Sequence, residues 1–150
     1  MTRVARGLRL FGHPVHAMLS DAPVALLGSS VVWDAAALAR GEAFWWALGF
    51  WNIALGVAAA AAAAVAGLID LAALDKESPA AATAVTHMAA ALGAVALFGG
   101  SLMARGGPGA PEGVGLATTV TLDVLGLAVL SAAGWLGGHL VFHFGVGRDG

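Results

Sequence analysis

The apolar residues of this chain are gathered into four long stretches, which short polar segments separate. The stretches cover residues 17–39, 44–71, 83–103 and 116–141. Each has the length of about 20 residues or more that an α-helix needs to cross a hydrocarbon core of roughly 30 Å. Strands seldom reach this length, so the stretches are better explained as helices. The pattern therefore predicts four transmembrane helices.

The segments between the stretches are short and rich in residues that break helices. They cover residues 40–42, 75–79 and 105–113, and glycine and proline are concentrated in the third. Short connections make consecutive helices antiparallel neighbours. We therefore predict an all-α integral membrane protein, with a single transmembrane domain over residues 1–150 that folds as an antiparallel four-helix bundle.

The composition agrees with a surface that faces lipid. Hydrophobic residues make up 59% of the chain and charged residues only 11%, whereas a soluble domain usually carries about 25% charged residues. The net charge of -2 excludes a strongly basic nucleic-acid-binding protein. The absence of cysteine excludes disulfides and thiolate metal sites. No serine lies in a nucleophile elbow, which disfavours a hydrolase but leaves open whether the protein is an enzyme.

The basic residues predict the orientation of the bundle in the membrane. The side that holds both termini contains Arg3, Arg6, Arg9, Lys76 and Arg148, and the opposite side contains Arg40 and Arg105. Because cytoplasmic loops carry an excess of Lys and Arg, both termini are expected to face the cytoplasm.

All the histidines are predicted to lie at the membrane face that holds the termini. His13 and His16 lie where the chain enters the first span, His87 lies near the start of the third, and His139 and His143 lie where the chain leaves the fourth. Ionisable residues inside spans are costly and are functional candidates for that reason. His13 and His16 would share one helix face if the first helix began at Pro14, a favoured position for proline. His139 and His143 are separated by about one helical turn.

Two carboxylates occur at a similar depth, Asp21 in the first span and Asp70 at the end of the second. A metal-ligating imidazole normally donates its other ring nitrogen to a carboxylate or a carbonyl. We therefore expect His16, His87 and His139 to converge in space, with Asp21 or Asp70 beside them.

Other polar residues are assigned lesser roles. His13 and His143 lie further out, so we expect them to be secondary ligands or, like Arg9, contacts of haem propionates. Asp34 and Asp123 have matching depths near the opposite membrane face. They fit either a hydrogen-bonded tie between helices or a proton path.

The two ends of the chain resemble a known family. The opening Gly-His-Pro-Val-His-Ala-Met-Leu-Ser-Asp-Ala-Pro, the histidine of the third span and the closing Gly-Trp-Leu-Gly-Gly-His-Leu-Val-Phe-His-Phe-Gly-Val-Gly are similar to bacterial membrane proteins of domain-of-unknown-function family 2231. The resemblance covers nearly the whole chain and implies a four-helix protein of the bacterial cytoplasmic membrane, without an established activity. Some relatives are fused to a Rieske iron–sulfur domain, which implies electron transfer nearby.

Three functions remain open, and the favoured one is a b-type cytochrome-like electron-transfer subunit. His87 with His16 or His139 would ligate haem b, and the absence of a Cys-x-x-Cys-His motif excludes covalent haem attachment. The second is a site for an iron, zinc or copper ion, in which Asp21 and Asp70 join the imidazoles. The third is a non-catalytic anchor or assembly subunit. The expected partners are the lipid bilayer and a Rieske-type or other redox protein, or a larger membrane complex.

Overall fold

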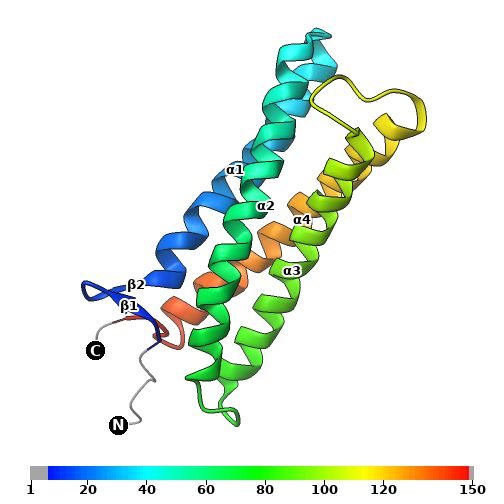
Figure 1. Cartoon of the computed structure of the whole chain (residues 1–150). Coiled ribbons are helices and arrows are strands. Elements are labelled where there is room, and N and C mark those ends of the chain that lie inside the picture. Colours follow the sequence, from blue (N-terminus) through cyan, green and yellow to red (C-terminus); the bar gives the residue numbers. More distant parts are fainter. Residues whose placement is uncertain (1–6, 149–150) are drawn as a thin grey trace.

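The computed structural model describes residues 7–148 and contains four long helices preceded by a small hairpin (Figure 1). The helices are α1 (Val15–Arg40), α2 (Ala43–Ala72), α3 (Pro79–Arg105) and α4 (Gly113–Phe142). The hairpin pairs β1 (Arg9–Leu10) with β2 (His13–Pro14). All four helices are long and apolar enough to cross a membrane. The predicted all-α transmembrane bundle is confirmed, and each helix extends one to four residues beyond its predicted span.

Local signals in the sequence explain where the helices end. Gly41 and Gly106 follow α1 and α3 with φ angles of 72° and 67°, in the left-handed region that favours glycine. At the start of α3, the Ser78 hydroxyl accepts a hydrogen bond of 3.2 Å from the Ala81 N–H. This serine cap with proline at the first helical position explains why α3 begins four residues before the apolar stretch.

The first helix begins at Val15 and not at Pro14. Pro14 is extended and pairs with Arg9 in the hairpin, while His13 pairs with Leu10. His13 therefore belongs to a strand, and the expectation that it shares a helix face with His16 is wrong. The pairing of β1 with β2 keeps His13 and Pro14 extended, so the helix can begin only after Pro14.

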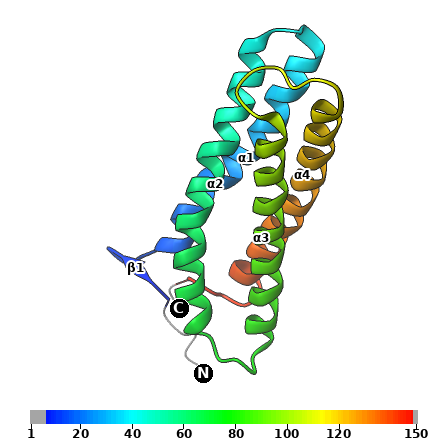
Figure 2. The same cartoon turned by 45° about the vertical axis from the view of Figure 1, so that its right-hand side comes forward.

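The four helices form two antiparallel hairpins. α1 packs along α2 and α3 along α4, and contacts between the two pairs are looser (Figures 1 and 2). The β hairpin, the C-terminal segment and the α2–α3 connection lie at one end of the bundle, which we call the terminal end. The other two connections lie at the opposite end. The predicted arrangement of short loops and antiparallel neighbours is confirmed.

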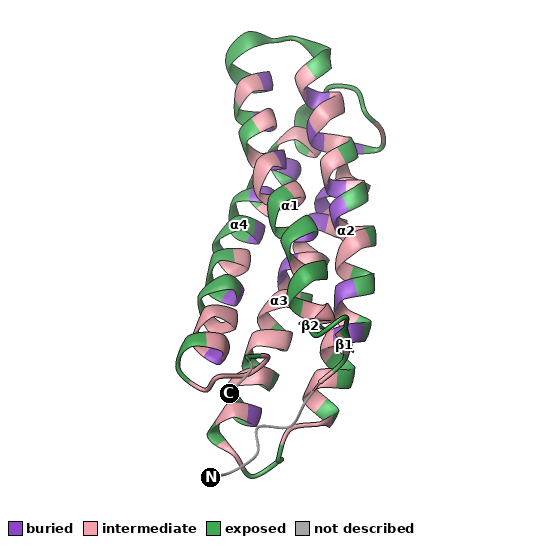
Figure 3. Cartoon of the chain, turned by 90° about the vertical axis from the view of Figure 1, so that its left-hand side faces the viewer, coloured by how far each residue is buried: buried purple, intermediate pink, exposed green. Residues whose placement is uncertain are grey.

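Burial is confined to a narrow interior (Figure 3). Leu27, Ile53 and Phe98 form the centre of the core, each with at most 1% of its surface exposed. Large apolar side chains are exposed along all four helices, for example Val32, Leu55, Leu92 and Leu125. An apolar exterior of this kind is what contact with lipid tails requires.

The two helical hairpins are internal repeats. Val-Ala-Leu-Leu-Gly-Ser-Ser at 24–30 in α1 matches Val-Ala-Leu-Phe-Gly-Gly-Ser at 95–101 in α3, 71 residues later. Leu-Gly at 55–56 in α2 matches Leu-Gly at 125–126 in α4, 70 residues later. The packing matches too, because a Cβ atom on Gly56 would lie 2.7 Å from Leu27, and one on Gly126 would lie 2.9 Å from Phe98. Both hairpins begin at the terminal end, so the repeats run in parallel, as in some transporter folds.

Candidate functional site

Two histidines at equivalent positions of the repeats lie beside each other near the terminal end. His16 comes from α1 and His87 from α3, and their ring centroids are 6.2 Å apart with the ring planes at 80°. Both side chains are half-buried. The convergence of His16 and His87 that the sequence predicted is therefore confirmed.

Each of these imidazoles is fixed by a carbonyl group of the neighbouring helix. The ring nitrogen Nδ1 of His16 lies 2.8 Å from the Ala63 carbonyl oxygen, and Nδ1 of His87 lies 2.8 Å from that of Ala133. A carbonyl oxygen only accepts, so Nδ1 carries the hydrogen and donates it. The lone pair of each neutral ring is then on Nε2, for which residues 7–148 provide no hydrogen-bond partner. Tautomers fixed in this way are typical of metal-binding histidines.

Two glycines make room for the rings. A Cβ atom on Gly67 would lie 2.9 Å from Cε1 of His16, and one on Gly137 would lie 3.2 Å from Cε1 of His87. Both glycines are four residues beyond the carbonyl that holds the same ring. The missing side chain at Gly137 therefore makes room for an imidazole.

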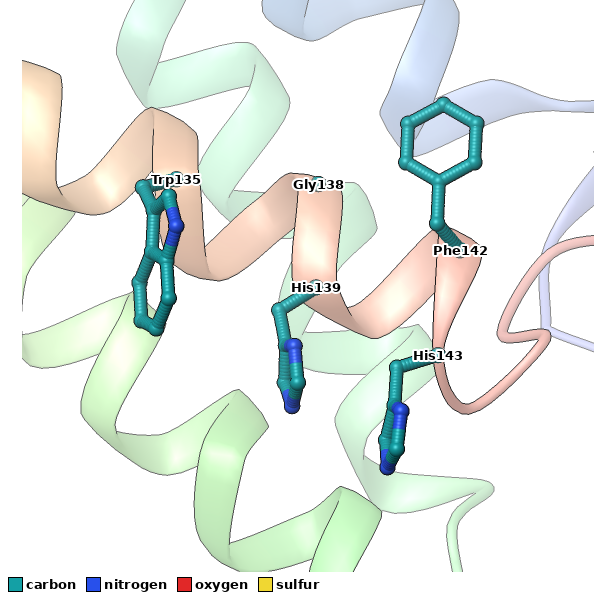
Figure 4. A pocket seen from close by; sticks show the side chains of 5 residues that line it. All are labelled: Trp135, Gly138, His139, Phe142 and His143. Carbon is teal, nitrogen blue, oxygen red and sulfur yellow. The ribbon is translucent and has the colours of Figure 1, made fainter.

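His139 and His143 form a separate group on α4. The rings of Trp135, His139 and His143 stack with centroid separations of 5.6 Å and 4.5 Å, and all three point to one side of the helix (Figure 4). They line an open cleft with Gly138 and Phe142. Among residues 7–148, no three His, Asp or Glu side chains lie close enough to hold one metal ion. The predicted convergence of His139 with the other two histidines is therefore not found.

The two carboxylates predicted beside the histidines have other surroundings. Asp21 is exposed on α1. Asp70 accepts a hydrogen bond of 2.7 Å from the Leu8 N–H and so anchors the chain that leads into the β hairpin. The imidazoles of His16 and His87 instead take backbone carbonyls as partners, and a carbonyl serves as well as a carboxylate to orient a ligating imidazole.

The remaining candidates at the terminal end also contact the backbone. His13 is exposed, with Nδ1 3.0 Å from the Phe11 carbonyl oxygen. Arg9 donates from Nη2 to the Gly147 carbonyl at 3.0 Å, which links β1 to the C-terminal segment. Arg3 and Arg6, which contribute to the predicted orientation, lie outside the described residues.

A buried ionic cluster occupies the opposite end of the bundle. Nη1 of Arg105 donates to Asp34 Oδ1 at 2.9 Å, and Nη2 contacts Oδ2 of both Asp34 and Asp123, the latter at 2.7 Å. The three side chains are only 1% to 5% exposed. Asp34 and Asp123 are thus tied together through Arg105, which agrees with one of the two roles that their depths allow. Asn52 of α2 donates a hydrogen bond to Ser29 of α1.

Arg105 is the member of this cluster that sequence reasoning missed. It was assigned to the third loop because the apolar stretch ends at Met103, whereas α3 continues to Arg105. The internal repeat could have revealed it, because Arg105 follows Asp34 by the same 71 residues that separate His87 from His16. Residues of opposite charge at equivalent positions of two packed repeats are a signal for an ion pair.

The comparison with known families agrees with this architecture. The model of the family described as predicted membrane protein (DUF2231) matches residues 12–150. The matched region includes all four helices, His16, His87 and the buried ionic cluster. No curated protein and no solved structure matches the chain. The chain therefore belongs to the DUF2231 family of membrane proteins.

Proposed function

We propose that the protein is a b-type cytochrome-like electron-transfer protein in which the imidazoles of His16 and His87 would together hold one haem b. The observation that supports this most strongly is the spacing of the two imidazoles. Two imidazoles that bind one metal ion with bonds of about 2 Å must have their ring centres within about 6 Å of each other. The ring centroids of His16 and His87 are 6.2 Å apart.

The number of ligands favours haem over a bare ion. Structural zinc sites have four ligands, and iron sites without porphyrin usually need three or more protein groups. Within residues 7–148 no third His, Asp or Glu joins the pair. A haem would need only two nitrogen ligands from the protein, because its macrocycle supplies the other four.

The residues around the pair have defined tasks in this proposal. The carbonyls of Ala63 and Ala133 accept the hydrogens on Nδ1, which would leave Nε2 to bind the metal and would make the rings better electron donors. Gly67 and Gly137 let the rings lie against α2 and α4. The haem would supply reversible one-electron transfer, and the protein would supply its position and its apolar surroundings.

The same proposal places the site at the cytoplasmic face of a bacterial cytoplasmic membrane. Arg9, Lys76 and Arg148 lie at the terminal end. At the opposite end Arg105 is buried in an ionic cluster, so that Arg40 is the exposed basic residue there. The burial of Arg105 strengthens the excess of positive charge at the terminal end. A Rieske-type or other redox partner would then exchange electrons with the haem at that face.

Visible spectra of the purified protein, oxidised and reduced, test the proposal. We expect sharp bands on reduction, which His16→Ala and His87→Ala each abolish or shift because the iron loses one axial nitrogen. The matched controls His13→Ala and His143→Ala should keep the spectrum, since these exposed rings are not axial ligands. A colourless protein with stoichiometric iron, zinc or copper would instead favour a simple metal site. A colourless protein without metal would favour an anchor subunit.

A further inference from the structure

The buried cluster of Asp34, Arg105 and Asp123 carries an unbalanced charge when it is fully ionised. Arginine keeps its proton in proteins, so it contributes one positive charge, and two carboxylates contribute two negative charges. All three side chains are at least 95% buried. A buried charge without a partner is strongly destabilising. The cluster therefore needs one further positive charge.

The surroundings provide no such charge. Trp46 and Gly49 of α2 face the cluster, with the guanidinium carbon of Arg105 5.9 Å from the centre of the Trp46 ring. In the two connections at this end of the bundle, Arg40 and Glu42 are exposed and pair with each other, and Glu112 is exposed. In the part of the chain that the structure describes, the cluster is thus formed by one cation from α3 and one carboxyl each from α1 and α4.

Two buried oxygen atoms without a hydrogen-bond partner indicate what compensates the charge. Oδ1 of Asp123 and Oγ1 of Thr119 have no hydrogen-bond partner, although their side chains are fully buried. Thr119 precedes Asp123 by one turn of α4, so both lie on the same helix face. Hard metal cations take about six or more oxygen ligands, far more than these two atoms, and the guanidinium would repel them. A proton needs only one carboxyl oxygen.

We propose that this cluster is a proton-binding site, which holds one exchangeable proton between Asp34 and Asp123. Both carboxyls contact the same nitrogen of Arg105, which brings them next to each other. Asp34 lies six residues before the end of α1, or about 9 Å along the helix. The site is therefore within reach of the aqueous phase opposite the terminal end. It is independent of the proposed haem site.

Infrared spectroscopy of the full protein in detergent measures this proton, because a carboxylic acid has a C=O band that a carboxylate lacks. At neutral pH we expect the wild type to show one carboxyl equivalent more than Asp34→Asn or Asp123→Asn. Each variant leaves one carboxylate to pair with Arg105, so the proton is lost. Arg105→Met should gain one equivalent over the wild type, because both carboxyls must then be neutral. Asp75→Asn, a loop variant, should match the wild type.

The band should shift in D₂O and should be the same when choline replaces sodium. A wild-type band equal to that of both Asn variants would overturn the proposal, and so would a band that sodium removes. If Arg105→Met does not fold, the comparison of the wild type with the two Asn variants still tests the proposal, because Asn keeps the shape of Asp.

Discussion

Replacing Gly67 with alanine tests the placement of His16 without reference to any cofactor. The new Cβ atom would lie 2.9 Å from Cε1 and 3.0 Å from Nδ1 of the imidazole. Contacts this short force the ring to move. The movement weakens the 2.8 Å hydrogen bond to the Ala63 carbonyl, because that bond depends on the position of Nδ1.

The magnitude follows from three contributions. Overpacking in an interior costs about 1–3 kcal/mol, and a lost hydrogen bond costs about 1 kcal/mol. Alanine gains up to about 1 kcal/mol over glycine in helix propensity. The matched control is Gly134→Ala in α4, which has the same propensity gain but no atom within 4 Å of the new Cβ. Relative to this control the propensity gain cancels, and Gly67→Ala should lose roughly 2–4 kcal/mol of unfolding free energy.

Unfolding in mixed detergent micelles measures these free energies. Gly137→Ala should fall between the other two variants, because its Cβ atom would lie 3.2 Å from Cε1 of His87. If Gly67→Ala were as stable as Gly134→Ala, the His16 ring would not lie against α2, and the proposed orientation of the pair would be refuted.

Further predictions concern the ends of the bundle. Asp70→Ala should speed amide hydrogen exchange in the β hairpin, because the Leu8 N–H loses its acceptor, while any visible spectrum stays the same; unchanged exchange would contradict the anchoring role. The hydrogen bond from Arg40 lowers the pKa of the Glu42 carboxyl, so this ion pair is complete at neutral pH and is lost as the pH falls through the lowered pKa. An NMR titration should show the pKa of Glu42 rising in Arg40→Gln, and an unaltered pKa would exclude the pair. Reporters fused to the N- and C-termini should both read cytoplasmic, and periplasmic signals would refute the charge argument.

The fold could be predicted because its signals are local. Length and hydropathy define a span without reference to any other part of the chain, and glycine and proline mark the connections. The errors lie at the boundaries, where other contacts decide. Pro14 is a favoured first residue of a helix, but it pairs with Arg9 in a strand. Arg105 follows the apolar stretch and is charged, as loop residues often are, but its hydrogen bonds to the buried Asp34 and Asp123 hold it in the last turn of α3.

The site could be predicted only in part, because depth is visible in a sequence and rotation about a helix axis is not. His16, His87 and His139 have similar depths, yet His139 stacks with Trp135 and His143 in a separate cleft. A helix that is apolar on all sides gives little indication of which face turns inward. The information was present in the repeat instead, since His16 and His87 occupy equivalent positions and His139 has no histidine counterpart, its equivalent being Ile69.

Electron paramagnetic resonance of the oxidised protein tests most directly whether His16 and His87 bind one haem iron together. Two axial imidazoles make the iron low-spin, and ring planes at 80° make the signal strongly anisotropic, because nearly perpendicular ligands leave two iron orbitals almost equal in energy. We expect this signal in the wild type and a high-spin signal in His16→Ala and in His87→Ala. High-spin haem iron in the wild type, or a protein that binds no haem, would contradict it.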